Sequence, residues 1–212
     1  MPISPSQATS STLNSMVASP TVMSFVERLV LTWKAKLFLF VGKRDLAADV
    51  FRTMLEKEPN SVYALNSLAY DALQRKHLVL AHQYFEKVLE LEPELSNSHF
   101  NLAFVSSELD RLPEAETQFR AAIAIEEKMD RAWYGLGLIL VKQRRFEEAI
   151  VTLKRNTQLQ PMSPFGWYQL ARVHMEINQP DEAQTILRHL NGFEPKVAKQ
   201  LARETGLKIE GF

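Results

Sequence analysis

The stretch YGLGLILVKQRRFEEA, residues 134–149, admits two interpretations. Its Gly-Leu-Gly opening and the three basic residues that follow are features of a phosphate-binding loop, whereas its apolar spacing is that of a helical repeat unit. A dinucleotide-binding loop of the form G-x-G-x-x-G needs a preceding strand and a third glycine, where this chain has Leu140. We therefore interpret Gly135 and Gly137 as residues inside a helix, where Gly137 allows close packing. The residues one repeat length away on either side test this interpretation.

A period of 34 residues runs through the chain from Ala149, the last residue of that stretch. Steps of 34 residues in both directions always reach an alanine: Ala47, Ala81, Ala115, Ala149 and Ala183. Four residues later, each unit has a large apolar residue: Phe51, Phe85, Phe119, Leu153 and Leu187. Twelve residues after each alanine, proline occupies four of the five positions: Pro59, Pro93, Pro161 and Pro195, with Glu127 as the exception. A spacing kept five times indicates a repeat array.

Each unit is predicted to be two short antiparallel helices. The first helix carries a Leu-Ala or Leu-Gly pair in most units: Leu68-Ala69, Leu102-Ala103, Leu136-Gly137 and Leu170-Ala171, with Lys34-Ala35 as the exception. Small residues at these positions let the two helices approach closely, and the proline ends the second helix. Ser61, Ser96 and Asp130 are candidate N-caps, and Pro113, Pro164 and Pro180 are expected early in helices.

This pattern resembles the tetratricopeptide repeat family, whose unit runs W-x2-L-G-x2-Y, then Ala, Phe and Pro. The clearest unit is residues 130–161, with Trp133, Leu136, Gly137, Ala149 and Pro161. The resemblance implies an all-α superhelical solenoid of five helix pairs over residues 22–195, with units starting near residues 28, 62, 96, 130 and 164. After it, KVAKQLARE (196–204) has one apolar side and is predicted to be a C-terminal capping helix, with a tail to residue 212.

Composition limits the classes of partner. Lys plus Arg and Asp plus Glu are both 25, so the formal net charge is +0, and no nucleic-acid partner is predicted. The chain has no cysteine, which excludes disulfides and cysteine-ligated zinc. Residues 1–21 are rich in Ser, Thr and Pro and are expected to be a disordered tail. Since neither a signal peptide nor a transmembrane helix is evident, we expect a cytoplasmic location.

No catalytic residues are predicted. None of the five histidines pairs with another at i, i+4 spacing, and no HExxH, G-x-S-x-G, Walker or kinase signature occurs. We therefore predict neither a metal site nor a cofactor, and no enzymatic activity. His99 occupies the repeat position that holds Trp133 and Trp167 in later units, so we expect it to pack in the core.

The resemblance implies that the first helix of each unit lines a concave groove. Most of the matching positions hold aromatic residues, Arg or Asn, a composition typical of binding hot spots. The predicted groove residues are Tyr63, Asn66, Tyr70, Asn97, Phe100, Asn101, Phe104, Arg131, Tyr134, Leu138, Phe165, Tyr168 and Arg172. Some of the aromatic side chains could instead turn sideways onto the next unit. Of the residues that clamp a chaperone C-terminal carboxylate in this family, only Asn101 and Arg131 have matches here.

A second candidate interface lies on the predicted helix at residues 22–41. Leu29, Trp33, Leu37 and Phe40 share one face of it, and no repeat precedes it to cover that face. Either the second helix and the Ser-rich tail fold over this face, or it is an interface for a second copy or another partner.

These observations predict a non-enzymatic protein–protein interaction module, an adaptor or assembly factor that holds a partner peptide or helix in its aromatic groove. The alternative is a structural subunit or homo-oligomer that assembles through the apolar N-terminal helix. A regulatory chain for a separate enzyme would have the same sequence features as the first of these.

Overall fold

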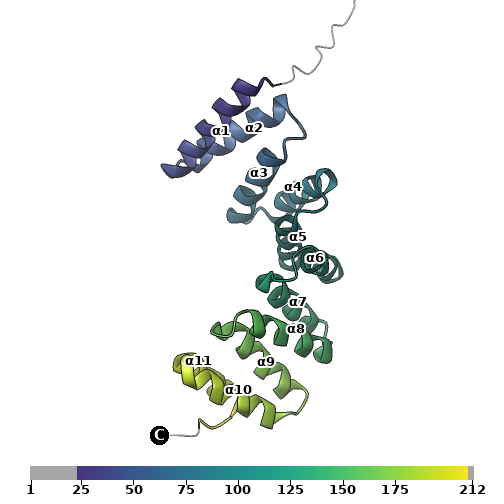
Figure 1. The fold of residues 1–212 in the computed structure, drawn as a ribbon, viewed down its shortest axis with the longest axis vertical. Coiled ribbons are helices and arrows are strands. Elements are labelled where there is room, and N and C mark those ends of the chain that lie inside the picture. The colour runs from purple at the N-terminus through teal and green to yellow at the C-terminus, as the bar shows by residue number, and fades with distance from the viewer. Residues whose placement is uncertain (1–22, 210–212) are drawn as a thin grey trace, which may run out of the picture.

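The computed structural model describes residues 23–209, and in that range the chain forms eleven α-helices and no strand. The predicted tail at residues 1–21 lies outside the described residues. The helices are α1 (Phe25–Phe40), α2 (Arg44–Lys57), α3 (Val62–Gln74), α4 (Leu78–Leu91), α5 (Ser96–Glu108), α6 (Leu112–Ile125), α7 (Asp130–Lys142), α8 (Phe146–Leu159), α9 (Pro164–Glu176), α10 (Pro180–Phe193) and α11 (Pro195–Thr205). The predicted fold class, five helix pairs followed by a C-terminal helix, is confirmed (Figure 1).

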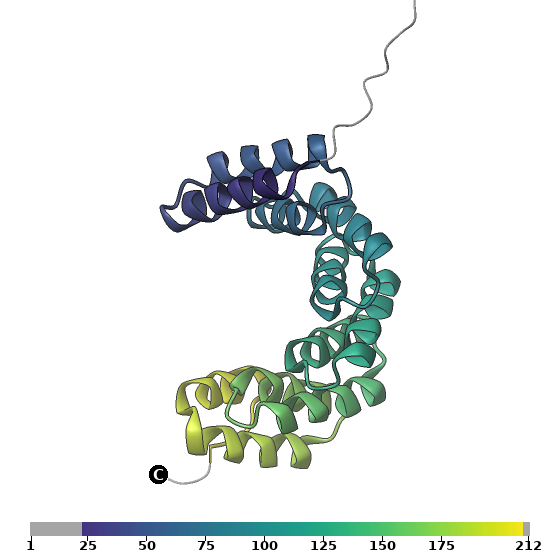
Figure 2. The ribbon, with the colours of Figure 1, turned by 45° about the horizontal axis from the view of Figure 1, so that its top comes forward.

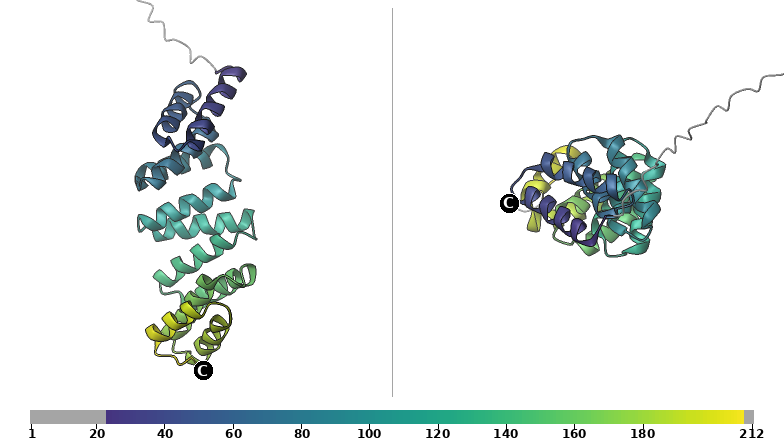
Figure 3. Two further views of the ribbon diagram at one scale, coloured as in Figure 1. Left: turned by 90° about the vertical axis from the view of Figure 1, so that its left-hand side faces the viewer. Right: turned by 90° about the horizontal axis from the view of Figure 1, so that it is seen from above.

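The helices stack in sequence order into a curved array. Each helix packs on the next one along the chain, and α11 returns to contact α9 as well as α10. Figure 2 shows the array bent into an arc, and Figure 3 shows the helices in layers along the long axis. Consecutive first helices also touch, at α5–α7 and α7–α9, which places the odd-numbered helices on the inner side of the arc. No helix within residues 23–209 is long and apolar enough to cross a membrane.

The turn inside each pair has the same backbone conformation in all five units. One residue per turn lies in the left-handed region, at intervals of 34 residues: Gly42 (φ 74°), Lys76 (60°), Asp110 (59°), Arg144 (61°) and Asn178 (57°). In the turn after α3, the N–H groups of Lys76 and His77 donate to the carbonyls of Leu73 and Ala72, respectively. These are the two hydrogen bonds of a Schellman motif. The same pair of bonds recurs in the other four turns. Arg144 of the opening stretch is therefore a turn residue.

The predicted starts of the later first helices are correct to within one residue, but α1 begins at Phe25, three residues after the predicted start at residue 22. Ser61 is the N-cap of α3, but Ser96 and Asp130 are the first residues of α5 and α7, whose N-caps are Leu95 and Met129. The Ser96 hydroxyl donates to Glu126 instead of capping its own helix. The three early prolines do stand in the first turns of α6, α9 and α10.

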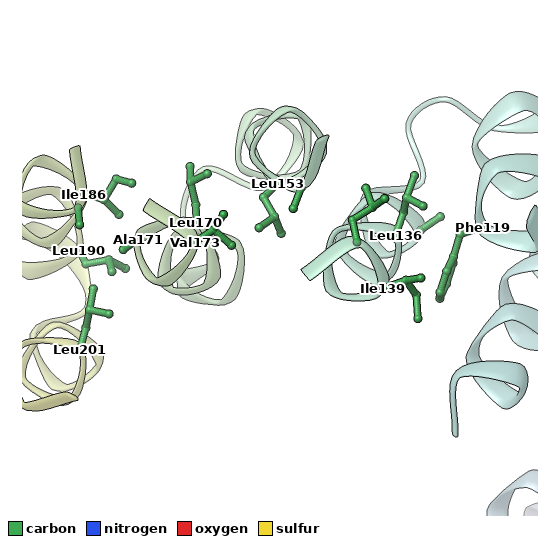
Figure 4. Close-up of a cluster of buried hydrophobic side chains, with 14 of the residues drawn as sticks. Phe119, Leu136, Ile139, Leu153, Leu170, Ala171, Val173, Ile186, Leu190 and Leu201 are labelled. Atoms are coloured by element: carbon green, nitrogen blue, oxygen red, sulfur yellow. The ribbon is translucent and has the colours of Figure 1, made fainter. Parts of the chain in front are cut away.

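The repeat residues form the core. All five repeat alanines are fully buried, and the large apolar residues four positions later are buried beside them. Figure 4 shows part of this core, with Phe119, Leu136, Leu153 and Leu170 between successive helices. A Cβ atom on Gly137 would lie 2.6 Å from the Leu153 side chain, which explains glycine at a position where other units have alanine.

His99 departs from the core packing that we expected. Its ring is only half-buried, and its nitrogens contact the Pro93 carbonyl (2.8 Å) and the Gln118 side chain (2.6 Å). Trp133 and Trp167 likewise donate their indole N–H to the carbonyl six residues earlier, at 2.8 and 2.9 Å. The position thus holds a ring N–H that ties the first helix to the preceding turn, and histidine supplies that group as well as tryptophan does.

Candidate partner-binding surface

The predicted groove residues all lie on the first helices α3, α5, α7 and α9, on the inner side of the arc. They differ in how far they reach solvent. The exposed members are Tyr63, Tyr70, Asn97, Phe104, Arg131, Phe165 and Arg172. The half-buried members are Asn66, Phe100, Tyr134, Leu138 and Tyr168, and Asn101 is buried.

Tyr70 and Asn101 join the second and third units. The Asn101 amide donates to the Tyr70 hydroxyl at 2.6 Å, and the Tyr70 ring packs edge-on against Phe85 with centroids 5.6 Å apart. A buried amide that already has this partner is poorly placed to bind a ligand carboxylate. Of the two residues that match the chaperone carboxylate clamp in the sequence, only Arg131 is therefore left as a candidate to bind a carboxylate.

Phe100 is turned sideways into the array. Its ring packs on Phe119, with centroids 5.8 Å apart, and the Arg131 guanidinium lies 4.5 Å from its centroid. Arg131 also donates to the side chain of Asn97 one unit earlier. These contacts hold both residues on the wall between the third and fourth units, so this aromatic ring is mainly a packing residue.

Tyr168 is fixed by the C-terminal helix. Its hydroxyl donates to Glu204 and accepts from the Gln200 amide at 3.5 Å, while the Arg172 guanidinium lies 5.8 Å from its ring centroid. Burial, and then the bond to Glu204, raise the pKa of Tyr168. The bonds from Tyr168 and Gln200 lower the pKa of Glu204. The capping helix is thus part of the inner surface.

Phe104 and Phe165 are the least constrained aromatic residues of the set. They are 43% and 67% exposed, and within residues 23–209 neither ring has an aromatic or cation–π partner. Phe165 borders a hollow of about 210 Å³ between α7, α9 and α11, whose lining includes Tyr134, Tyr168, Val197 and Gln200. This hollow is suited to an apolar side chain of a partner.

Two further hollows lie at the same repeat position, three units apart. One, of about 260 Å³, is lined by Val141, Arg144, Phe146, Gln169, Arg172, Val173 and Glu176. The other, of about 290 Å³, is lined by Leu39, Arg44, Ala47, Ala48, Phe51, Ser67, Tyr70, Asp71 and Gln74. Each lies where the turn of one helix pair meets the next first helix, and the first is charged whereas the second is mainly apolar.

The contribution of α11 to this surface was missed in the sequence. Val197 and Gln200 line the hollow beside Phe165, and Glu204 binds Tyr168. Adding 34 to the bounds of α9 gives residues 198–210, a range that overlaps α11. One more step of the repeat would therefore have predicted that α11 packs beside α9 as the first helix of a further unit.

Two polar clusters lie on the second helices. His82 is buried in α4, with Nδ1 3.0 Å from Glu86 and Nε2 2.7 Å from Glu114 of α6. Together these three side chains could offer ligand atoms to a metal, but the two carboxylates contact opposite ring nitrogens, so no single ion could replace both contacts. In the other cluster, Glu116 of α6 accepts from Arg120 (2.9 Å) and Arg145 (2.6 Å).

The predicted N-terminal interface residues are exposed. Leu29, Trp33, Leu37 and Phe40 lie on the side of α1 that points away from α2, whereas Leu31, Ala35 and Phe38 pack on the other side. Of the alternatives, cover of this face by the second helix is not what the structure has, and the Ser-rich tail lies outside the described residues. Two ion pairs, Arg28–Glu58 (3.0 Å) and Glu27–Lys57, fasten the start of α1 to the end of α2.

Comparisons with known proteins agree with this architecture. Structures similar to this chain include a MamA protein, with a TM-score of 0.74 and 16% identity over 86% of this chain and 97% of that one. MamA 41-end from Desulfovibrio magneticus RS-1 has a TM-score of 0.73 and 18% identity, over 86% of this chain and 98% of that one. YrrB, described as a TPR protein with an unusual peptide-binding site, has a TM-score of 0.72 and 18% identity, over 80% and 88%. At these identities the likeness shows the fold alone.

The sequence comparisons give the family. No curated protein sequence matches the chain. A family model described as tetratricopeptide repeat matches residues 34–96 and 107–156, together more than half of the chain. This protein therefore belongs to the tetratricopeptide repeat family.

Proposed function

We propose that this protein is a non-enzymatic adaptor or assembly factor that holds a peptide or helix of a partner protein along the inner surface of the arc. The tetratricopeptide fold supports a protein–protein interaction module, and YrrB, a protein of similar fold, is described as having an unusual peptide-binding site. The observation that carries the proposal is the exposure of Phe104 and Phe165, two large rings that have no aromatic or cation–π partner within residues 23–209.

The inner surface would take an extended or helical segment with apolar and aromatic side chains. Phe165 and its neighbouring hollow would hold one apolar anchor, and Phe104 a second. Arg172 and Glu176, beside the charged hollow, would contact polar groups of the same segment. Aromatic anchors in partly enclosed sites carry most of the energy in such interfaces.

The test uses a Phe104→Ala/Phe165→Ala variant. Its matched control is Val151→Ala/Met162→Ala, which removes similarly exposed apolar groups from α8 and the turn after it. All chains are used as bait in native extract, and retained proteins are identified by mass spectrometry. The affinity of the retained partner's binding segment is then measured by calorimetry.

We expect the groove variant to weaken that affinity more than tenfold, since a hot-spot residue contributes on the order of 2 kcal/mol. The control should bind as the wild type does. Equal binding by both variants would refute the groove assignment. Tyr70→Ala is a poorer probe than these two, because it would leave the buried Asn101 amide without its acceptor.

The second candidate is a structural subunit or homo-oligomer assembled through the N-terminal helix. The exposure of Leu29, Trp33, Leu37 and Phe40 supports it. Light scattering distinguishes the two candidates: Trp33→Ser/Leu37→Ser should reduce the measured mass of the assembly, whereas the groove variant should leave it unchanged.

A further inference from the structure

The outer side of α1 is a continuous apolar surface, called here the α1 face. It consists of Phe25, Val26, Leu29, Val30, Trp33, Leu37, Phe40 and Val41, all exposed. Phe40 is 88% exposed and Trp33 65%, in a helix at one end of the array that packs mainly on α2 (Figure 1). With 3.6 residues per turn, these side chains fall within one broad arc centred on Trp33. A surface of this size is larger than the apolar patches that monomeric proteins usually expose.

The α1 face is not shaped to receive another helix pair of the array. In the inner units, Val30 corresponds to the buried small residues Ala64, Ser98, Ala132 and Gly166, which pack against the preceding second helix. Trp33 corresponds to Ser67, Asn101, Gly135 and Gln169, and at Gly135 even a Cβ atom would lie 2.4 Å from Phe119 of that helix. The indole is much larger than any of these side chains, so it disfavours the close approach on which the stacking depends.

Positive charges border the α1 face on both sides. Lys34 lies at one edge of the apolar arc and Lys36 near the other. Within the described part of the chain, neither lysine has an acidic partner. The one acidic residue of α1, Glu27, is paired with Lys57. The apolar face therefore carries a net positive rim.

This charge pattern disfavours a second copy of the chain. Two α1 faces packed antiparallel would meet near the middle of the helix, at Trp33. The lysines at positions 34 and 36 of both copies would then lie close together with no acidic residue to offset them. Interfacial membrane helices place Trp, Phe and Leu on one face with basic residues beside it, and the exposed side of α1 has Trp33 with Lys34 and Lys36 beside it.

We propose that the α1 face binds an anionic lipid surface, with α1 lying in the plane of the bilayer interface. The aromatic and aliphatic side chains enter the boundary between headgroups and acyl chains, and Lys34 and Lys36 contact lipid phosphates. The remainder of the array then projects from the surface, with its inner side open to a partner.

The test is flotation of the full chain with lipid vesicles. One set of vesicles is phosphatidylcholine alone, and the other contains about one third phosphatidylglycerol. The face variant is Trp33→Ser/Leu37→Ser, and the charge variant is Lys34→Gln/Lys36→Gln. Val151→Ser/Met162→Ser is the matched control, with similar exposed apolar groups far from α1. Circular dichroism checks that every variant keeps its helices, and light scattering gives the mass without lipid.

We expect the wild type and the control to float with the anionic vesicles and not with phosphatidylcholine alone. Each lysine removed should lower the partition coefficient about fivefold, and the face variant should not float. Absence of flotation by the wild type would overturn the proposal, as would equal flotation by the face variant. A wild-type dimer that the face variant dissociates, with no lipid binding, would instead show that the face joins two copies.

Discussion

Each of the five turns within a helix pair has one residue with a left-handed backbone, and glycine occupies only the first of these positions. For a residue with a side chain, this conformation costs on the order of 1 kcal/mol relative to glycine. This cost is smallest for Asp110 and Asn178, because their short polar side chains tolerate the left-handed region. Lys76 has no such advantage.

Lys76→Gly should therefore raise the free energy of unfolding, by about 1 kcal/mol. The reciprocal change, Gly42→Ala, should lower it by a similar amount, since no atom lies within 4 Å of the new methyl group and only the backbone is strained. Urea denaturation followed by circular dichroism measures both. The same sign for both substitutions would contradict the explanation.

Gly137 is a packing residue rather than a conformational one. Its position inside α7 needs no unusual backbone, but an added Cβ would lie 2.6 Å from the side chain of Leu153, which is fully buried. Gly137→Ala should cost about 1–3 kcal/mol through overpacking. The control is Gly192→Ala in α10, where no atom lies within 4 Å and alanine should stabilise the helix by about 0.5–1 kcal/mol. Opposite signs in the unfolding free energies are the expected result.

At the scale of the elements, one carboxylate connects two second helices. Burial raises the pKa of Glu116, but the hydrogen bonds from Arg120, Arg145 and Gln143 together lower it by more than burial raises it. The pKa of Glu116 in the folded protein therefore lies below the ordinary glutamate value. A depressed folded pKa means that the ionised group stabilises the fold above its unfolded pKa. That stabilisation is lost as the pH falls towards the folded pKa.

The wild type should therefore lose more stability than Glu116→Gln between neutral pH and a pH below the ordinary glutamate value of about 4.3. Urea denaturation of both chains at the two pH values measures this difference. Glu90→Gln, which alters an exposed carboxylate paired with Lys87 on α4, is the control and should behave as the wild type does. An equal loss in all three chains would show that the α6–α8 contact is unaffected by the titration of Glu116.

At the scale of the whole molecule, the two ends of the array differ in how far their apolar residues are covered. The C-terminal end is covered by α11, whose Ala198 and Leu201 are fully buried against the last pair. Within residues 23–209 the N-terminal pair has a neighbour on one side only, and its core residues form a cluster separate from the one that runs from α5 to α11. Stability in such arrays depends on each unit and its neighbours.

Backbone amides in α1 and α2 should therefore exchange with deuterium faster than those in α7 and α8, because the first pair can open without disturbing the rest. Amides in α10 should be better protected than those in α1, since that end is capped. Hydrogen exchange followed by mass spectrometry, without lipid, checks both. Uniform protection along the chain would mean that the array unfolds as one unit.

The sequence alone determined the architecture. The 34-residue spacing of alanine, the large apolar residue and proline identified the helix pairs, because each position has one fixed task within a local unit of two helices. The buried alanines and the pairing of Gly137 with Leu153 followed from that local geometry. The starts of α3, α5, α7 and α9 came within one residue, since a Ser, Asp or Pro marks each of them. The start of α1 was predicted three residues too early.

Which aromatic side chains are left free for a partner was decided only by the tertiary structure. Tyr70 with Asn101, Phe100 with Arg131, and Tyr168 with Glu204 are contacts between residues 31–36 positions apart, made across neighbouring units. Their existence depends on the curvature of the array and on side-chain rotamers, which a repeat pattern does not encode. The exposure of the α1 face has the same origin: its residues are apolar like those of a core helix, and only the absence of a covering helix in the described structure leaves them at the surface.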